Sequence, residues 1–124
     1  EPWIRRGIDF LVARQNPDGG WGESPISYRD PAFAGRGVSS APMTGLVAAA
    51  LIETGATERP AGEDAVARAT NHLLSAQQED GSWPNGTYVV TNIPPDSFYT
   101  YGGAALHLPL EALARRRQQL AARR

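Results

Sequence analysis

The sequence predicts an all-α fold that forms part of an α/α toroid. Apolar residues recur at helical spacing in several segments, one helical segment is repeated later in the chain, and amphipathic helices alternate with a helix that is apolar nearly all round. The chain has 124 residues, enough for one small domain but short for a self-contained two-domain enzyme. We therefore expect residues 1–124 to form a single domain. Its four main helices cannot close a toroid alone.

The first helix is expected to follow Pro2, which suits a first helical turn, and to end at Pro17, because proline and the glycines after it stop a helix. An equivalent later helix is expected to begin near Glu63-Asp64, since acidic residues favour a helix N-terminus, and to end at Asp80-Gly81. The first helix carries an apolar stripe at three- and four-residue spacing: Ile4, Gly7, Ile8, Leu11 and Val12.

The segment between these helices, Pro42 to Thr54, predicts a helix buried on several sides, and Gly55 suits its C-terminal end. A fourth helical stretch is expected from about Phe98 to Arg124, with a kink at Pro109. The long connection from Gln78 to about Ser97 is too apolar for a solvated loop, so we expect it to line a cavity or an interface.

The repeat extends beyond the helices themselves, because Ile4 to Trp21 aligns with Val66 to Trp83 at a constant offset and without gaps. Six pairs are identical: Arg6/Arg68, Leu11/Leu73, Gln15/Gln77, Asp18/Asp80, Gly19/Gly81 and Trp21/Trp83. Each copy contains a Gln that can bond free backbone groups at a helix end, an Asp-Gly tight turn, and a Trp with a large flat surface. We predict a structural role as helix clamps, rather than a catalytic role, for Gln15, Gly20, Trp21, Gln77, Gly81 and Trp83.

These two turns resemble the QW motif of the triterpene cyclase superfamily. The likeness continues through Ser27-Tyr-Arg-Asp-Pro-Ala-Phe-Ala-Gly-Arg-Gly37 and Ile93-Pro-Pro-Asp-Ser-Phe-Tyr-Thr-Tyr-Gly-Gly103, and it covers essentially the whole chain. Taken together, the motifs look like the last fifth of a bacterial squalene–hopene cyclase, that is, the C-terminal segment of the α/α-barrel domain of a class II terpene cyclase.

The resemblance implies a reaction in which an Asp-x-Asp-Asp acid protonates a linear polyprenoid such as squalene and cations propagate through an apolar, aromatic cavity. No Asp-x-Asp-Asp occurs in this sequence. In the family this acid lies upstream of the region represented here, so we expect the isolated chain to be inactive and to need the upstream part of the cyclase or a partner chain. The resemblance also implies a cytoplasmic location, with peripheral contact at the inner face of the bacterial membrane.

The family's cavity residues carry over only around the last loop. Tyr101 falls where the cyclases keep a Tyr that faces the cavity. Ile93 and Ser97 occupy family Phe positions, and Ala104 replaces a further family Tyr. Phe98 is either a compensating cavity residue or ordinary core. These departures leave open another polyprenoid substrate, and they also leave open a non-catalytic QW-repeat module that serves as a binding or scaffold protein.

Composition excludes several other functions. The chain has no cysteine, which excludes disulfides, zinc ribbons and thiol catalysis, and its net charge of −1 gives no indication of a nucleic-acid partner. His72 and His107 lack companion ligands, so we expect no metal ion, and no cofactor is expected either. The arginines of the closing segments Arg115–Arg117 and Arg123–Arg124 are interpreted as a solvated helix end, with anionic lipid as the alternative partner.

Overall fold

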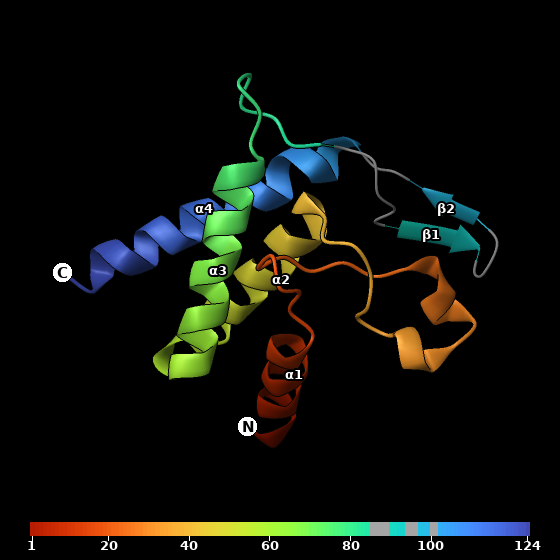
Figure 1. Ribbon diagram of the computed structural model, residues 1–124. Coiled ribbons are helices and arrows are strands. Elements are labelled where there is room, and N and C mark those ends of the chain that lie inside the picture. The colour runs from red at the N-terminus through yellow and green to blue at the C-terminus, as the bar shows by residue number, and fades with distance from the viewer. Residues whose placement is uncertain (85–89, 94–96, 100–101) are drawn as a thin grey trace.

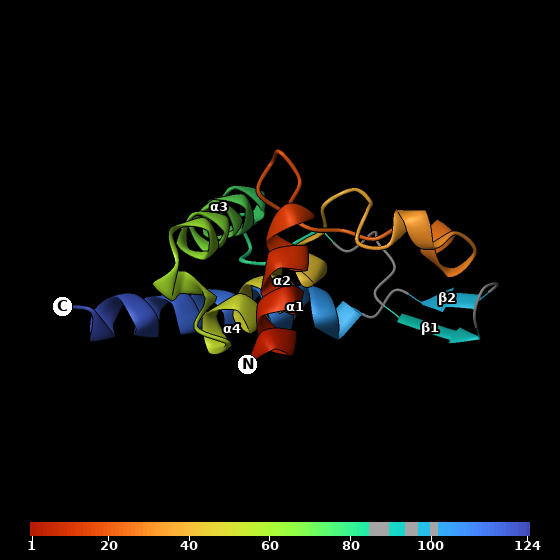
Figure 2. The ribbon, with the colours of Figure 1, turned by 90° about the horizontal axis from the view of Figure 1, so that it is seen from below.

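A computed structural model describes residues 1–84 and 102–124, together with the backbone of residues 90–93 and 97–99. Four α-helices dominate the described chain: α1 (Pro2–Ala13), α2 (Ala41–Glu53), α3 (Pro60–Ala76) and α4 (Gly102–Ala122). Helix α2 packs against both α3 and α4, and α1 packs against α3 (Figures 1 and 2). The predicted all-α fold is confirmed for these main elements.

The ends of the helices follow the local sequence. Helix α2 is capped by the Ser40 hydroxyl, which accepts a hydrogen bond from the Met43 amide at 3.3 Å. The chain leaves α2 through Gly55, whose φ of +70° is accessible to glycine at little cost. Helix α3 begins at Pro60, a few residues before the predicted start, because proline tolerates the first helical position, where its missing N–H is not needed.

The predicted start of the fourth helix is wrong. Residues Val90–Ile93 (β1) and Ser97–Tyr99 (β2) form a small antiparallel hairpin, and α4 begins only at Gly102. Phe98 therefore lies in a strand, paired with Thr91, rather than in a helix. The physical reason is present in the sequence: the aromatic residues Phe98 and Tyr99 favour a strand, as do the β-branched residues of the partner strand β1. The kink at Pro109, which lies inside α4, stays a prediction.

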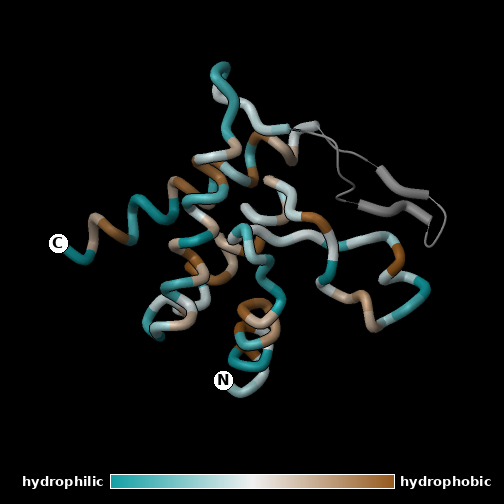
Figure 3. Tube along the Cα trace, in the orientation of Figure 1, coloured by the Kyte–Doolittle hydropathy of each residue, from teal (hydrophilic) through white to brown (hydrophobic). Residues whose placement is uncertain are grey.

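Helices α1 and α3 run in the same direction in Figure 1, so the two Trp-bearing turns lie at the same end of their helices, as the repeat predicts. Along α1 and α4, hydrophobic residues are interspersed with hydrophilic ones, as amphipathic helices require (Figure 3). The long connection between α1 and α2 contains two short 3-10 helices, η1 (Pro25–Tyr28) and η2 (Pro31–Phe33), and a third, η3 (Ala56–Glu58), joins α2 to α3.

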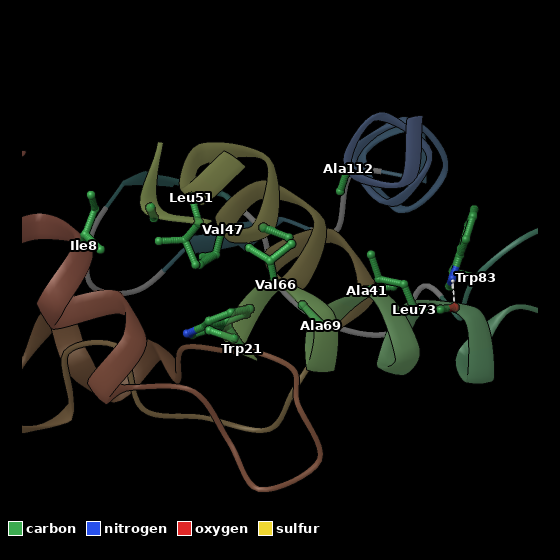
Figure 4. Packing of buried hydrophobic residues seen from close by; sticks show 13 residues of the cluster. Ile8, Trp21, Ala41, Val47, Leu51, Val66, Ala69, Leu73, Trp83 and Ala112 are labelled. Carbon is green, nitrogen blue, oxygen red and sulfur yellow. Dashed lines mark hydrogen bonds between the residues drawn. The ribbon is translucent and has the colours of Figure 1, made fainter. Parts of the chain in front are cut away.

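The core lies where α2 meets α3, and Trp21 packs beneath it (Figure 4). Helix α2 is buried on most sides, which agrees with its uniformly apolar sequence, but Leu46 is 48% exposed. The closely packed cluster consists of Ile8, Trp21, Ala41, Val47, Ala48, Leu51, Ala56, Ala65, Val66, Ala69, Leu73, Trp83 and Ala112.

Candidate functional site

The turn after α1 ties that helix to α3. The side-chain amide nitrogen of Gln15 donates to the carbonyl oxygen of Gly19 at 2.8 Å and to the carbonyl oxygen of Ala65, on α3, also at 2.8 Å. The guanidinium of Arg68 donates to the side-chain oxygen of Gln15. One glutamine side chain thus closes its own turn and binds the neighbouring helix.

The tight turn itself is held by Asp18. Its carboxylate accepts from the Gly20 amide at 2.9 Å and from the Ser39 hydroxyl at 2.7 Å, while Gly19 takes a φ of +87°. Burial alone would raise the pKa of Asp18, but these hydrogen bonds and the nearby ring of His72 outweigh it and lower the pKa. The carboxylate therefore stays charged and acts as a fixed acceptor in the turn.

Trp21 follows this turn, and its buried side chain hydrogen-bonds to α1. Its indole N–H donates to the carbonyl oxygen of Leu11, near the end of α1, at 2.8 Å, and its backbone N–H donates to the Thr44 hydroxyl of α2 at 3.0 Å. The side chain is almost fully buried. The residue therefore links α1 to α2. In the alternating order that the sequence predicts for a toroid, α1 and α3 are the outer helices and α2 and α4 the inner ones.

The turn after α3 repeats the hydrogen bonds made within the first turn and the bond from the indole to the preceding helix. Gln77 donates to the Gly81 carbonyl at 2.9 Å, Asp80 accepts from the Ser82 amide at 2.9 Å, and Gly81 takes a φ of +85°. The indole N–H of Trp83 donates to the carbonyl oxygen of Leu73 at 2.8 Å (Figure 4). The hydrogen bonds from Ser82 lower the pKa of Asp80. Unlike Gln15, Gln77 reaches no second helix among the described residues.

The inner helices α2 and α4 cross with their backbones in close contact. A methyl group on Gly45 would lie 2.5 Å from the carbonyl carbon and oxygen of Leu108 and 2.6 Å from the nitrogen of Pro109. Three leucines within two residues of this crossing are strongly exposed: Leu46 (48%), Leu106 (54%) and Leu110 (60%). Sequence reasoning missed this feature, although the leucine spacing in α4 could have indicated an apolar stripe.

The basic end of α4 is only partly the solvated helix end that its sequence suggests: Arg117, Arg123 and Arg124 are exposed, but Arg115, Arg116 and Arg123 form ion pairs. Arg116 is buried and forms an ion pair with Glu63 of α3, to which Arg123 also binds at 2.9 Å. Arg115 pairs with Glu53 and Glu111. The hydrogen bond from Arg116 lowers the pKa of Glu63 despite partial burial, and Arg123 adds to the effect. These pairs attach α4 to the rest of the fold.

Comparison with known proteins decides the family. Residues 1–118 match the model of the squalene-hopene cyclase C-terminal domain. The chain belongs to this family. It is 39% identical over 118 residues to a probable squalene–hopene cyclase of Sinorhizobium fredii and 38% identical over 121 residues to a squalene–hopene cyclase of Bradyrhizobium diazoefficiens. It is also 35% identical over 132 residues to a dammaradiene synthase of Dryopteris crassirhizoma.

These alignments cover nearly all of this chain but a small part of each relative. The three matches span 94%, 94% and 98% of the chain and 18%, 17% and 19% of the relatives. The chain therefore spans about a fifth of the length of the cyclases that it resembles. In the part of the chain that the structure describes, no helix is long and apolar enough to cross a membrane.

The structure places some of the cavity residues expected from the squalene–hopene cyclase resemblance and leaves Tyr101 undescribed. The hairpin pairs Ile93 with Ser97 across its two strands, so the backbone brings these two positions together. Phe98 lies next to Ser97 in β2. Ala104 is buried in the first turn of α4. Tyr101 lies outside the described residues.

Proposed function

We propose that this chain is the C-terminal part of a class II terpene cyclase and supplies part of the wall of its substrate cavity. The match of residues 1–118 to the squalene-hopene cyclase C-terminal domain carries the proposal. The first QW turn supports it, because it joins α1 to α3 through Gln15 and to α2 through Trp21, as expected of a segment of a toroid.

The proposed substrate is squalene or a related linear polyprenoid. The relatives named squalene–hopene cyclases support this choice, and so does the exposed apolar surface of the inner helices at Leu46, Leu106 and Leu110. A carbocation that crosses a cavity must meet no nucleophile before the cascade ends, and leucine side chains offer none. The rest of the cyclase supplies the acid that protonates the polyprenoid, and Tyr101 offers an aromatic face to a cationic intermediate.

A chimera tests this proposal. Residues 1–118 replace the matching segment of the Bradyrhizobium squalene–hopene cyclase, and the purified protein is incubated with squalene. We expect cyclised triterpenes in the solvent extract by gas chromatography and mass spectrometry. A folded chimera that returns only squalene would contradict the proposal and favour the non-catalytic scaffold module instead.

A variant pair in the same chimera tests the cavity wall. Leu106→Asp places a carboxylate on the proposed wall, where it would intercept or trap a cation, so we expect less product or prematurely terminated products. Arg117→Asp changes an exposed residue elsewhere on α4 and should leave the products unchanged. Equal product profiles for both variants would exclude Leu106 from the wall.

Peripheral contact with the inner face of a bacterial membrane remains a proposal. Arg117 and Arg124, both exposed at the end of α4, are available to anionic lipid, and no hydrogen bond or ion pair joins either side chain to another described residue. Vesicle sedimentation with and without anionic lipid measures this contact. Equal binding to both kinds of vesicle would exclude an electrostatic contribution.

A further inference from the structure

A glycine at position 45 lets the two inner helices touch backbone to backbone. Helix α4 packs mainly on α2 (Figures 1 and 2). Where they cross, a methyl group on Gly45 would lie 2.5 Å from the carbonyl carbon and oxygen of Leu108 and 2.6 Å from the nitrogen of Pro109. Gly45 and Pro109 are both buried. Because both helices lie within this chain, the contact needs no residue outside it.

The crossing lies beside the proposed cavity wall. Leu46, one of the exposed leucines of that wall, follows Gly45 directly, and Leu106 lies on the stretch of α4 that crosses α2. Ala104, a predicted cavity residue, stands in the first turn of the same helix. The separation of α2 from α4 at Gly45 therefore sets how far the Leu46 side chain lies from the wall residues of α4.

Ion pairs fix the second half of α4 but not its first half. Arg115 pairs with Glu53 at the end of α2, and the buried Arg116 pairs with Glu63 of α3. Residues 102–110 contain no Asp, Glu, Lys or Arg and form no such pair. The first half of α4 is therefore placed by packing, and its closest approach to α2 is at Gly45.

The two halves of α4 meet at a weak point of the helix. Pro109 lies inside α4 and has no N–H, so it cannot donate to the carbonyl oxygen of Ala105 one turn earlier. A displacement imposed at Gly45 is therefore taken up mainly by the first half of α4, because the second half is tied to α2 and α3.

We propose that Gly45 is a positioning residue of the cyclase: its missing side chain sets the separation of the wall residues on α2 from those on α4, and so determines how far the polyprenoid is cyclised before the cascade ends. This inference rests on the proposed function. Carbon atoms in ordinary contact lie about 3.5–4.0 Å apart, so a methyl group at position 45 requires a displacement of about 1 Å.

A displacement of this size changes the outcome of the cascade. Each ring closes only when a cation meets the next double bond at bonding geometry, and a misplacement of about 1 Å can cost about 100-fold in rate. When the wall withdraws, the chain leaves this geometry and competing steps come first. Loss of a proton from the cation gives an alkene, and addition of water with release of a proton gives an alcohol, both with fewer rings.

The product ratio of the chimera that carries residues 1–118 tests the inference. Gly45→Ala should raise the ratio of incompletely to fully cyclised triterpenes at least about fivefold, measured by gas chromatography and mass spectrometry. This ratio separates positioning from stability, because unfolded enzyme forms no product and lowers all yields equally. Gln15→Ala is the matched control: it weakens the bond between the first turn and α3, away from the crossing, and should leave the ratio unchanged.

A second background keeps the test decisive if Gly45→Ala alone does not fold. Pro109→Ala returns a donor to α4 and stabilises the helix. Gly45→Ala added to this background should again raise the ratio over that of Pro109→Ala alone. The rise should be smaller, because the stiffer helix passes part of the displacement to its second half.

The outcomes separate this inference from the proposed function. A chimera that cyclises squalene with the same product ratio before and after Gly45→Ala, in both backgrounds, overturns the inference and leaves the proposed function standing. A folded chimera that returns only squalene overturns both. An equal rise for Gln15→Ala also overturns the inference, because any loss of stability would then loosen the cavity.

Discussion

Replacing Gly45 by alanine tests the close crossing of the inner helices. In an isolated helix this change would stabilise by about 1 kcal/mol, because alanine has the higher helix propensity. At Gly45, however, the new methyl group would lie 2.5 Å from the Leu108 carbonyl and 2.6 Å from the Pro109 nitrogen. These are backbone atoms, so the contact can be relieved only by moving α2 or α4.

Overpacking of this kind costs roughly 1–3 kcal/mol, and occasionally more, in other cores. Because the clash at Gly45 is with backbone atoms, we expect an overpacking cost near the upper end of this range, which exceeds the gain in helix propensity. The expected net effect of Gly45→Ala is a loss of about 2 kcal/mol in the free energy of unfolding.

Gly7→Ala is the matched control. Gly7 also lies inside a helix, but nothing stands within 4 Å of a methyl group at this position. We expect this variant to be stabilised by about 0.5–1 kcal/mol. Urea unfolding at low protein concentration, followed by far-UV circular dichroism, measures both changes. If Gly45→Ala gains stability as Gly7→Ala does, the helices do not cross at Gly45.

Three further predictions concern the turns and the ion pairs. Trp21→Ala and Trp83→Ala should each lower the free energy of unfolding by about 3–5 kcal/mol, because both side chains are buried and each indole N–H donates to a helix carbonyl. Urea unfolding measures this loss, and a loss below about 0.5 kcal/mol would contradict the clamp role. Gln15→Ala should destabilise more than Gln77→Ala, by about 1–2 kcal/mol in the same assay, because Gln15 binds a second helix and Gln77 reaches none among the described residues; equal losses would contradict this. Because the pKa of Glu63 is lowered in the folded chain, the unfolded chain binds more protons than the folded chain as the pH falls. The stabilisation of the folded chain by ionised Glu63 is therefore complete above the ordinary pKa of 4.5 and is lost as the pH falls through the lower folded value. Unfolding measured between pH 6 and about 3 should therefore show a flatter acid limb for Glu63→Gln than for the unaltered chain, and superimposable limbs would exclude the ion pair.

The repeat and the four helices could be predicted from the sequence because their causes are local. Apolar period, prolines at helix starts, and glycines at helix ends act over a few residues, and the two QW turns repeat in structure as they do in sequence. The start of α4 was predicted wrongly because the apolar character of the segment from Phe98 onward outweighed the strand preference of its aromatic residues Phe98 and Tyr99.

Other features depend on contacts between residues far apart in the chain. Nothing near Arg116 in the sequence indicates Glu63, so the buried ion pair at the end of α4 could not be predicted. The unequal surroundings of the two turns are another case, because the similar sequence patterns at Gln15 and Gln77 give different contacts among the described residues. Such differences follow from which helix happens to lie beside each turn.

The most direct test of the central claim is the product distribution of the chimera when Tyr101 is changed. If this chain forms the cavity wall, Tyr101→Ala removes a cation–π contact of about 2 kcal/mol, so the rate of squalene consumption should fall about tenfold or more and prematurely terminated products should appear. Tyr101→Phe keeps the ring and should be much milder, while Ser97→Phe should shift the mixture toward more cyclised skeletons. Gas chromatography with mass spectrometry measures all three. An unchanged rate and product distribution for Tyr101→Ala would contradict the claim that this segment lines the cavity.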